Sequence, residues 1–286
     1  MSAQFIAAAQ HWLSGNAVLP DENAEAISRV TAELADTLAE RPALVIGVSG
    51  PPGTGKSTFA GACMAGLEAT GKTCLGLSLD DYYLPLSERQ ALAASRHPLM
   101  QRRGTPGTHD IGLLARHLAL LTGEQHGSLE LPLFDKSCDD RSIETRTIAP
   151  GTRPTVLFIE GWLVGAPPEA ASVLEAPVNE LEALQDADGA WRRWTNRKLD
   201  DYHQALTPFL DLRWHLDAPD WSCVVEWRWQ QERERTNPWL NGPAEVRDFL
   251  ATYQRICMHM HRSCAQWSDA VVTLDRHHRP MIRRIE

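Results

Sequence analysis

The segment GPPGTGKST at residues 50–58 combines glycines, a lysine and hydroxyl side chains at a spacing suited to holding a phosphate chain. Gly50, Gly55, Lys56 and Ser57 satisfy the pattern G-x-x-x-x-G-K-[ST]. Glycines allow successive backbone N–H groups to curve around an anion, and a following helix directs its positive end at the same anion. We expect Lys56 to contact the β- and γ-phosphates of ATP, and Ser57 to place its hydroxyl on Mg²⁺.

The context of this segment supports the nucleotide interpretation. It lies between the apolar stretch ALVIGVSG and an amphipathic helical pattern, which is the arrangement that the motif requires. The alternative is a Gly-Pro turn that merely joins a strand to a helix, and the complete motif in this context favours the nucleotide site. The predicted cofactor-binding residues are Gly50, Pro51, Pro52, Gly53, Thr54, Gly55, Lys56, Ser57 and Thr58.

Two neighbouring carboxylates, Asp80 and Asp81, end a second apolar segment, TCLGLSLDD. In an open α/β sheet, ligands bind beyond the carboxyl ends of the strands. Phosphoryl transfer to a hydroxyl needs a carboxylate that takes the proton of that hydroxyl close to the γ-phosphate. We therefore expect this pair on the acceptor side of a phosphotransfer site. The alternative is that one of the two only caps a loop.

Apolar and amphipathic segments alternate along the chain, which is the order that a parallel sheet requires. We predict buried strands at 43–50, 73–81, 155–162, 211–219 and 270–275, and helices at 22–40, 56 to about 70, 110–123, 175–189, 191–210, 221–237 and 243–267. The segment 129–135 reads as extended, and the polar stretch 135–154 as turn-rich. This alternation predicts an α/β fold, a three-layer α/β/α sandwich of the P-loop NTPase type with a mostly parallel sheet and helices on both faces.

Length and composition predict a single domain over residues 1–286, with an N-terminal helical extension at 1–42. The net charge of −9 repels phosphate backbones, so we expect no nucleic-acid partner. No basic leader and no membrane-spanning apolar run is visible, and the six cysteines show no C-x-x-C spacing. These features favour a cytoplasmic protein with reduced thiols and no membrane contact. They leave the oligomeric state open.

A phosphate-binding loop is shared by GTPases, motor ATPases, transporters and kinases. The string NRKLD at 196–200 does not match the N-K-x-D motif of guanine-specific GTPases, and no L-S-G-G-Q signature is present. A D-x-x-G string runs from Asp186 to Gly189, but it follows a polar helical stretch rather than a strand. What remains favours a small-molecule kinase, with an ATPase that acts as a switch as the alternative from another class.

Six further segments carry a resemblance to a known family. They are LDDYY at 79–83, RGTPGTHD at 103–110, LPLFDKS at 131–137, DDR at 139–141, IEGW at 159–162 and WRWQQE at 227–232. In this order they resemble the plant-type D-glycerate kinases and, more distantly, uridine kinase, phosphoribulokinase and pantothenate kinase. The resemblance implies a small hydroxy acid as acceptor, with uridine, a sugar phosphate or pantothenate as the alternative acceptors.

The resemblance also implies roles for single residues. Asp80 matches the family's catalytic base, with Asp81 as the second candidate, and Tyr83 matches an aromatic residue beside the acceptor. Glu160, which ends an apolar strand, corresponds to the acid that orients Mg²⁺ directly or through water. An unpaired carboxylate at such a position is otherwise costly to bury.

A hydroxy acid presents a carboxylate, which a cation has to meet. The candidates are Arg103, His109, Lys136 and Arg141, each with a surface charge or an internal ion pair as its alternative. Asp110 joins the predicted substrate-binding residues, although it is also suited to cap the helix that it begins.

The family resemblance further implies a helical lid at about 221–242. Its arginines, Arg228, Arg233 and Arg235, would close over the transferring phosphoryl group, and Arg228 is the preferred catalytic candidate. The alternative is an amphipathic helix whose charges lie in water.

Two other patterns suggest ligands but have simpler explanations. In CMHMHRSC at 257–264, Cys257, His261 and Cys264 share one helix face in the manner of a metal site. One straight helix brings about two such ligands together, and no partner cluster is visible elsewhere in the sequence, so we expect packed, partly buried residues instead. Tryptophans that neighbour arginines, as at 227–229, suggest base stacking, but packing of the core and lid is the commoner explanation.

Overall fold

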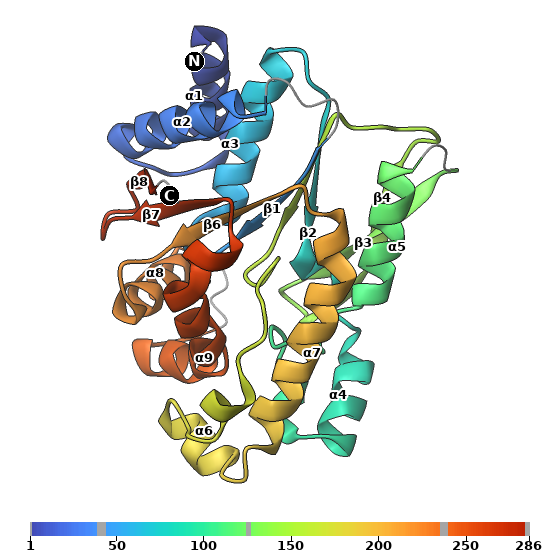
Figure 1. Ribbon diagram of the computed structural model, residues 1–286, viewed down its shortest axis with the longest axis vertical. Coiled ribbons are helices and arrows are strands. Elements are labelled where there is room, and N and C mark those ends of the chain that lie inside the picture. The colour runs from blue at the N-terminus through green and yellow to red at the C-terminus, as the bar shows by residue number, and fades with distance from the viewer. Residues whose placement is uncertain (1, 39–43, 124–126, 235–239, 284–286) are drawn as a thin grey trace.

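The computed structural model describes residues 2–38, 44–123, 127–234 and 240–283. Its main sheet has the strand order β2-β5-β1-β6-β7-β8 (Figure 1). The strands are β1 Leu44–Ser49, β2 Cys74–Ser78, β5 Val156–Glu160, β6 Leu212–Asp217, β7 Ala270–Leu274 and β8 Pro280–Arg283. All neighbours pair in parallel except β8, which runs antiparallel to β7. The predicted mostly parallel sheet is confirmed, and β8 is an addition to it.

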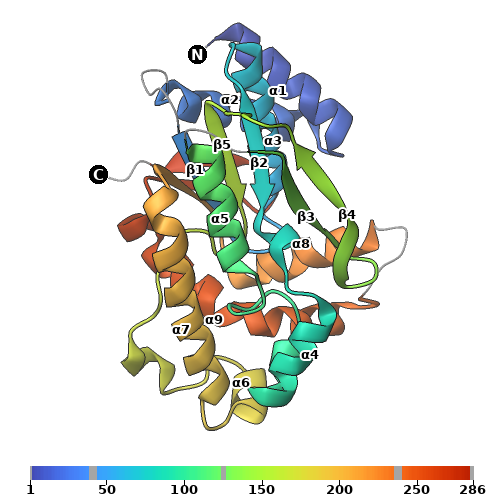
Figure 2. The same ribbon diagram turned by 90° about the vertical axis from the view of Figure 1, so that its right-hand side faces the viewer.

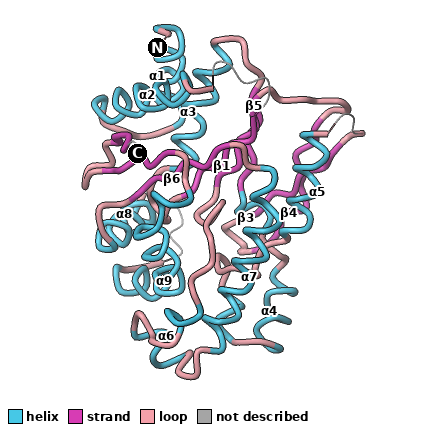
Figure 3. The backbone as a smooth tube through the Cα atoms, viewed as in Figure 1, coloured by secondary structure: helices cyan, strands magenta, loops and turns pink. Residues whose placement is uncertain are grey.

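Helices cover both faces of this sheet. Trp214 of β6 contacts Phe59 of α3 (Lys56–Ala69), whereas the next residue, His215, contacts Trp267 of α9 (Pro243–Trp267). Because successive residues of a strand point to opposite faces, α3 and α9 lie on opposite sides of β6. Figure 3 shows the strands between these helices. The predicted three-layer arrangement is confirmed.

The two N-terminal helices, α1 (Ala3–Asn16) and α2 (Asp21–Asp36), pack against α3. A Cβ atom added to Gly61 of α3 would lie 2.2 Å from the Trp12 ring, and one added to Gly66 would lie 2.5 Å from the Phe5 ring. Both glycines therefore allow the helices to approach closely. Within the N-terminal region the structure thus describes two helices.

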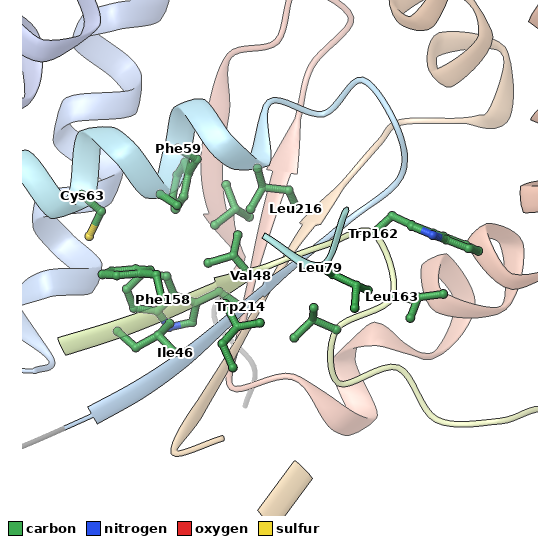
Figure 4. Packing of buried hydrophobic residues seen from close by; sticks show 14 of the residues in the cluster. Ile46, Val48, Phe59, Cys63, Leu79, Phe158, Trp162, Leu163, Trp214 and Leu216 are labelled. Carbon is green, nitrogen blue, oxygen red and sulfur yellow. The ribbon is translucent and has the colours of Figure 1, made fainter. Parts of the chain in front are cut away.

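The core lies between α3 and the central strands. Ile46, Val48, Phe158 and Trp214 are almost completely buried. Figure 4 shows these side chains packed together, with Phe59 of α3 at one side of the cluster. Central strands of a parallel sheet are covered on both faces, which is why β1 and β5 are almost continuously apolar.

A second, two-stranded sheet is formed by β3 (Leu129–Asp135) and β4 (Asp140–Ile148), which pair in antiparallel fashion (Figure 2). We refer to residues 129–148 as the ribbon. The prediction that 135–154 is only turn-rich is wrong for β4. Residues 144–147 of this strand are exposed, so it lacks the apolar alternation that marks a half-buried strand in the sequence.

The part of the chain that the structure describes contains several further helices. They are α4 Leu86–Ser95, α5 Ile111–Thr122, α6 Glu180–Gln185, α7 Ala190–Leu206 and α8 Trp221–Arg233, with short 3₁₀ helices η1 Leu79–Tyr82, η2 Pro98–Gln101, η3 Ala171–Leu174 and η4 Thr207–Phe209. The helix predicted at 175–189 is reduced to α6, and α4 was not predicted. Among the described residues, no helix is long and apolar enough to cross a membrane.

The parallel pairing brings the ends of three strands to one edge. Glu160, the last residue of β5, is in register with Val48 of β1 and with Ser78 of β2. The loop at 50–55 therefore leaves β1, and η1 leaves β2, beside the Glu160 carboxylate. This edge is the place where open α/β sheets bind ligands.

Candidate active site

A cavity of about 430 Å³ opens at this edge of the sheet. One wall is the loop after β1, and the facing walls come from η1, the ribbon, the end of β5, and α8 with α9. The lining residues are Pro52, Gly53, Gly55, Lys56, Ser57, Thr58, Ser78, Asp80, Asp81, Tyr83, Arg103, Lys136, Glu160, Gly161, Trp162, Arg228, Gln231, Phe249 and Tyr253.

The loop at 50–55 has the curvature that phosphate binding requires. Gly50, Gly53 and Gly55 have φ of 149°, 86° and 76°, which is a region that favours glycine. A Cβ atom at Gly50 would lie 2.4 Å from the Leu216 carbonyl oxygen. Helix α3 begins directly afterwards, at Lys56, so its N-terminus points at the cavity.

Lys56 bridges this loop. Its Nζ donates to the Pro51 carbonyl at 3.0 Å. Burial lowers the pKa of Lys56, while the carboxylates of Glu160 and Asp80 act in the opposite direction. Thr54 is buried and donates to the same carbonyl at 2.9 Å. Gly50, Pro51 and Thr54 thus shape the loop from behind, while the other six predicted loop residues line the cavity.

The loop tip is supported by the turn between β7 and β8. His278 Nε2 lies 3.0 Å from the Gly53 carbonyl oxygen, and the His278 ring lies 3.9 Å from the Trp227 ring of α8, centre to centre. Burial lowers the pKa of His278, so the neutral ring donates Nε2–H to Gly53. Sequence reasoning did not find this contact, because His278 lies 225 residues along the chain from Gly53.

Asp80 faces the phosphate-binding loop from η1 and pairs with Lys136 of the ribbon. Lys136 Nζ lies 2.6 Å from Asp80 Oδ2. Burial raises the pKa of Asp80, but the ammonium of Lys136, with smaller contributions from His109 and Lys56, outweighs it and lowers the pKa to about 2. Asp80 is therefore ionised at neutral pH. Asp81 also lines the cavity, but its Oδ1 accepts from the Phe134 backbone N–H at 3.2 Å and so holds the ribbon.

The donors for a magnesium ion lie together at the base of the cavity. Ser57 is the second residue of α3. Glu160 ends β5, and its Oε1 accepts from Ser78 Oγ at 2.7 Å. Hydroxyl and carboxylate oxygens are the ligands that Mg²⁺ takes beside a nucleotide phosphate. The residues present therefore fit this ion. Ser78 was not predicted, and its hydroxyl orients the Glu160 carboxylate.

Arg103 is held on the cavity wall by Asp139, the residue that ends the turn of the ribbon. Asp139 forms ion pairs with Arg103 and with the fully buried Arg89, whose Nη1 is 3.0 Å from Asp139 Oδ2. Its backbone has φ of 57°, which is uncommon for a residue other than glycine. Asp139 belongs to the DDR motif, but the sequence did not indicate its partners.

Three predicted substrate residues do not line the cavity but lie behind Tyr83. His109 stacks on the Tyr83 ring at 4.3 Å, and burial lowers its pKa to about 3, so it is neutral. Arg141 Nη2 donates to the Tyr83 carbonyl at 2.9 Å. Asp110 Oδ1 accepts from Leu113 N–H at 3.0 Å and caps α5. These residues therefore position Tyr83 and its loop.

Three aromatic side chains hold the loop 103–110, and the sequence did not indicate this role for any of them. Trp162 Nε1 donates to the Gly104 carbonyl at 2.9 Å, and Tyr253 OH donates to the Arg103 carbonyl at 3.1 Å. Tyr202 OH accepts from the Gly107 N–H at 2.7 Å. In the sequence, buried aromatic residues of this kind cannot be distinguished from ordinary core residues.

Arg228 lines the cavity from α8. Its guanidinium pairs with the buried Glu232 and lies 5.8 Å from the centre of the Phe249 ring. Arg233 lies over the Trp229 ring, at 5.9 Å, and does not line the cavity. Arg235 and the predicted lid residues 235–239 lie outside the described residues. Of the predicted lid arginines that the structure describes, Arg228 is thus the one on the cavity wall.

Comparison with known proteins identifies the family. No protein-family model matches the chain. The uncharacterized kinase mug58 of Schizosaccharomyces pombe is 35% identical over 196 residues, which are 66% of this chain and 69% of that protein. The chloroplastic D-glycerate 3-kinase of Arabidopsis thaliana is 30% identical over 224 residues, which are 74% of this chain and 46% of that enzyme.

The fold has close counterparts among solved structures. The D-glycerate 3-kinase from Cryptococcus neoformans superposes with a TM-score of 0.69 and 24% identity, over 90% of this chain and 98% of that one. At this level of identity the superposition establishes the fold alone, and the sequence matches establish the relationship. The chain is an ATP-dependent phosphotransferase and belongs to the family of P-loop kinases that includes the D-glycerate 3-kinase of Arabidopsis thaliana.

Proposed function

We propose that this kinase transfers the γ-phosphoryl group of ATP to a hydroxyl of D-glycerate, with Mg²⁺ as its metal cofactor. The observation that carries the proposal is the pair formed by Asp80 and Lys136, which lines the same cavity as the phosphate-binding loop. It puts a carboxylate and an ammonium beside each other where an acceptor with both a hydroxyl and a carboxylate would lie. The relationship to the Arabidopsis enzyme supports the choice of acid.

The cations of the acceptor wall suit a small carboxylate. Lys136 comes from the ribbon and Arg103 from the loop after η2, and both line the cavity. The planar guanidinium of Arg103 has a donor geometry that matches a carboxylate. Lys136 is half exposed and has a flexible side chain, which lets its ammonium move from Asp80 to the carboxylate of the acceptor.

Asp80 is the base in this proposal. Its carboxylate accepts the proton of the reacting hydroxyl as the oxygen attacks the γ-phosphorus. When Lys136 turns to the acceptor, Asp80 loses the interaction that lowers its pKa, and burial then makes it a stronger base. Binding of the acid and activation of the hydroxyl are thus coupled through one ion pair.

On the nucleotide side of the cavity, positively charged groups neutralise the charge of the triphosphate. The backbone N–H groups at the start of α3, the Lys56 ammonium and the Arg228 guanidinium surround the position of the triphosphate. Bound Mg²⁺ would supply further charge neutralisation at the β- and γ-phosphates, held by Ser57 and Glu160. Phe249 and Trp162 line the cavity with apolar surface, which reduces the amount of water around the reacting groups.

A comparison of acceptors tests the proposal. Purified protein with Mg²⁺ and ATP is incubated with D-glycerate, L-glycerate, uridine, ribulose 5-phosphate or pantothenate, and ADP release is followed. We expect turnover with D-glycerate, and ³¹P NMR of the product identifies the hydroxyl that reacts. Faster turnover with another acceptor would replace D-glycerate, and ATP hydrolysis that no acceptor accelerates would favour a switch ATPase.

A further inference from the structure

Outside the kinase cavity, a second cluster of ligand-type side chains forms where β6 meets α9. His215 and Asp217 share one face of β6, and His261 and Cys264 share one face of α9. One ligand atom from each of His215, Asp217 and Cys264 lies within 4.8 Å of the other two. His261 Nδ1 lies 2.8 Å from Asp217 Oδ1. His261 and Cys264 of the helix motif thus lie beside ligand-type side chains of a strand.

The position of the His215 ring is that of a metal ligand. Its side chain is fully buried, and Nδ1 lies 3.0 Å from Ser49 Oγ. Ser49 donates its own proton to the Trp214 carbonyl oxygen, at 3.4 Å, so it accepts from Nδ1–H. This tautomer leaves a lone pair on Nε2. A hydrogen bond from one ring nitrogen to a neighbouring group is the usual support of a histidine whose other nitrogen binds a metal.

His215 Nε2 has no hydrogen-bond partner among the described residues. The nearby carboxylate oxygen, Asp217 Oδ1, is 3.7 Å away, which is too long for a hydrogen bond. A buried polar atom without a partner costs free energy, and native structures rarely retain one without a reason. The atom points to a ligand that completes the cluster.

We propose that His215, Asp217, His261 and Cys264 bind one Zn²⁺ ion that ties α9 to β6 beside the phosphate-binding loop. Two imidazole nitrogens, a carboxylate oxygen and a thiolate sulfur are ligands that Zn²⁺ accepts in a tetrahedral site. Mg²⁺ prefers oxygen ligands alone, so the magnesium ion of the kinase cavity does not suit this cluster.

Binding of the ion changes the protonation of the cluster in a defined way. A cysteine thiol with ordinary surroundings is protonated at neutral pH, whereas zinc binds the thiolate. The zinc–sulfur bond replaces the sulfur–hydrogen bond, and one proton is released to solvent. The neutral imidazoles bind through their lone pairs and Asp217 as the carboxylate, so the ion neutralises two negative charges.

An access route for the ion exists. Asp217 and His261 line a separate cavity of about 260 Å³ between α8, α9 and Pro51. The His261 side chain is 51% exposed, so it can turn toward solvent and capture an ion, whereas the other three ligands are buried. Since Ser49 immediately precedes Gly50, the zinc site contacts the phosphate-binding loop through the Ser49–His215 hydrogen bond.

Metal analysis of the full chain tests the proposal. Chelator-treated protein is dialysed against Zn²⁺, and bound metal is measured by mass spectrometry. We expect one Zn²⁺ per chain and a loss of affinity of about tenfold or more in Cys264→Ser and in His261→Gln. The matched control is Cys257→Ser, because Cys257 is also buried in α9 but is not one of the ligands. The half-exposed His261 can be replaced with little risk to folding, which circular dichroism checks.

Co²⁺ provides a second readout that does not depend on activity. A cobalt–thiolate bond gives a charge-transfer absorption in the near ultraviolet, which we expect in the native chain and in Cys257→Ser but not in Cys264→Ser. Glu160→Gln should retain the Zn²⁺, since Glu160 belongs to the kinase cavity. The proposal is overturned if the native chain binds no stoichiometric Zn²⁺, or if Cys264→Ser and His261→Gln both bind it like the native chain.

Discussion

Lys136 Nζ lies 2.6 Å from Asp80 Oδ2, so a proposed acceptor-binding cation is paired with the proposed catalytic base. The two residues come from separate parts of the fold, the turn of the ribbon and η1. Their contact lowers the pKa of Asp80 to about 2. Under the proposed function, the two residues remain paired until an acceptor enters the cavity.

Replacement of the base tests its assigned role. We expect Asp80→Asn to lower kcat by about 10²- to 10⁴-fold, because the amide keeps the shape of the side chain but cannot take the proton. Affinity for Mg²⁺-ATP, measured by calorimetry, should change little. Asp81→Asn is the matched control, since Asp81 mainly holds the ribbon. A large loss of kcat in the control with near-native turnover in Asp80→Asn would exchange their roles.

Removal of the ammonium should shift the pH dependence. In Lys136→Gln, burial is no longer opposed by Lys136, so the pKa of Asp80 rises from about 2 toward or above its ordinary value of 3.8. The acidic limb of kcat/KM against pH moves to higher pH, and KM for D-glycerate rises. Lys198→Gln is the control, because Lys198 forms a similar ion pair with Asp201, at 2.7 Å, outside the cavity.

The same pair contributes to stability in a pH-dependent way. Since the folded-state pKa of Asp80 is lower than its ordinary value, its contribution is complete above about pH 4 and is lost as the pH falls toward 2. Urea unfolding at pH 3 and at pH 7 should therefore differ less for Asp80→Asn than for the native chain. An equal difference in both proteins would contradict the assignment of this pKa.

Asp139 should be important for the stability of the fold and for holding Arg103 in the proposed acceptor site. Asp139→Asn weakens two ion pairs, to Arg89 and Arg103, whose side chains are 0% and 5% exposed. Loss of one partner of a buried pair costs about 3 kcal/mol or more of the free energy of unfolding. The neighbouring Arg102–Asp248 pair is more exposed, so Asp248→Asn should cost about 1 kcal/mol or less. Denaturant unfolding compares the two variants.

Gly104 is the position where a methyl group should be most harmful to the acceptor wall. Its φ is 113°, and a Cβ atom would lie 1.8 Å from the Tyr253 hydroxyl oxygen. We expect Gly104→Ala to destabilise the fold by about 1–3 kcal/mol and to raise KM for the acceptor. The control, Gly112→Ala in α5, has no atom closer than 3.9 Å and should stabilise the helix by up to about 1 kcal/mol.

The sequence predicted best those features that are encoded within a few residues. The phosphate-binding loop is a contiguous motif, and Asp80 and Glu160 end apolar segments, so their shared edge follows from parallel pairing. The contacts of Asp139 and His278 connect distant parts of the chain, and no local pattern contains them. For this reason the supports of the site could not be predicted, although its central residues could.

The direction in which a side chain points is the other feature that could not be predicted from the sequence. His109 and Arg141 belong to the predicted acceptor set, yet both lie behind Tyr83 and support it. A charged residue in a motif shows that the position matters, but not whether it faces the ligand or the protein. Cys264 of the helix motif at 257–264 is a further case, because His215 and Asp217 of β6 come close to it only when strand and helix are packed together.

The ribbon contributes Lys136 to the cavity wall without being part of the main sheet. Residues 129–148 form their own antiparallel pair outside the main sheet, and their turn carries both Lys136 and Asp139. The nucleotide half is built from the ends of the main strands. Under the proposed function, a change in the sequence of this turn would alter the choice of the acceptor alcohol, while the phosphate-binding loop keeps its structure.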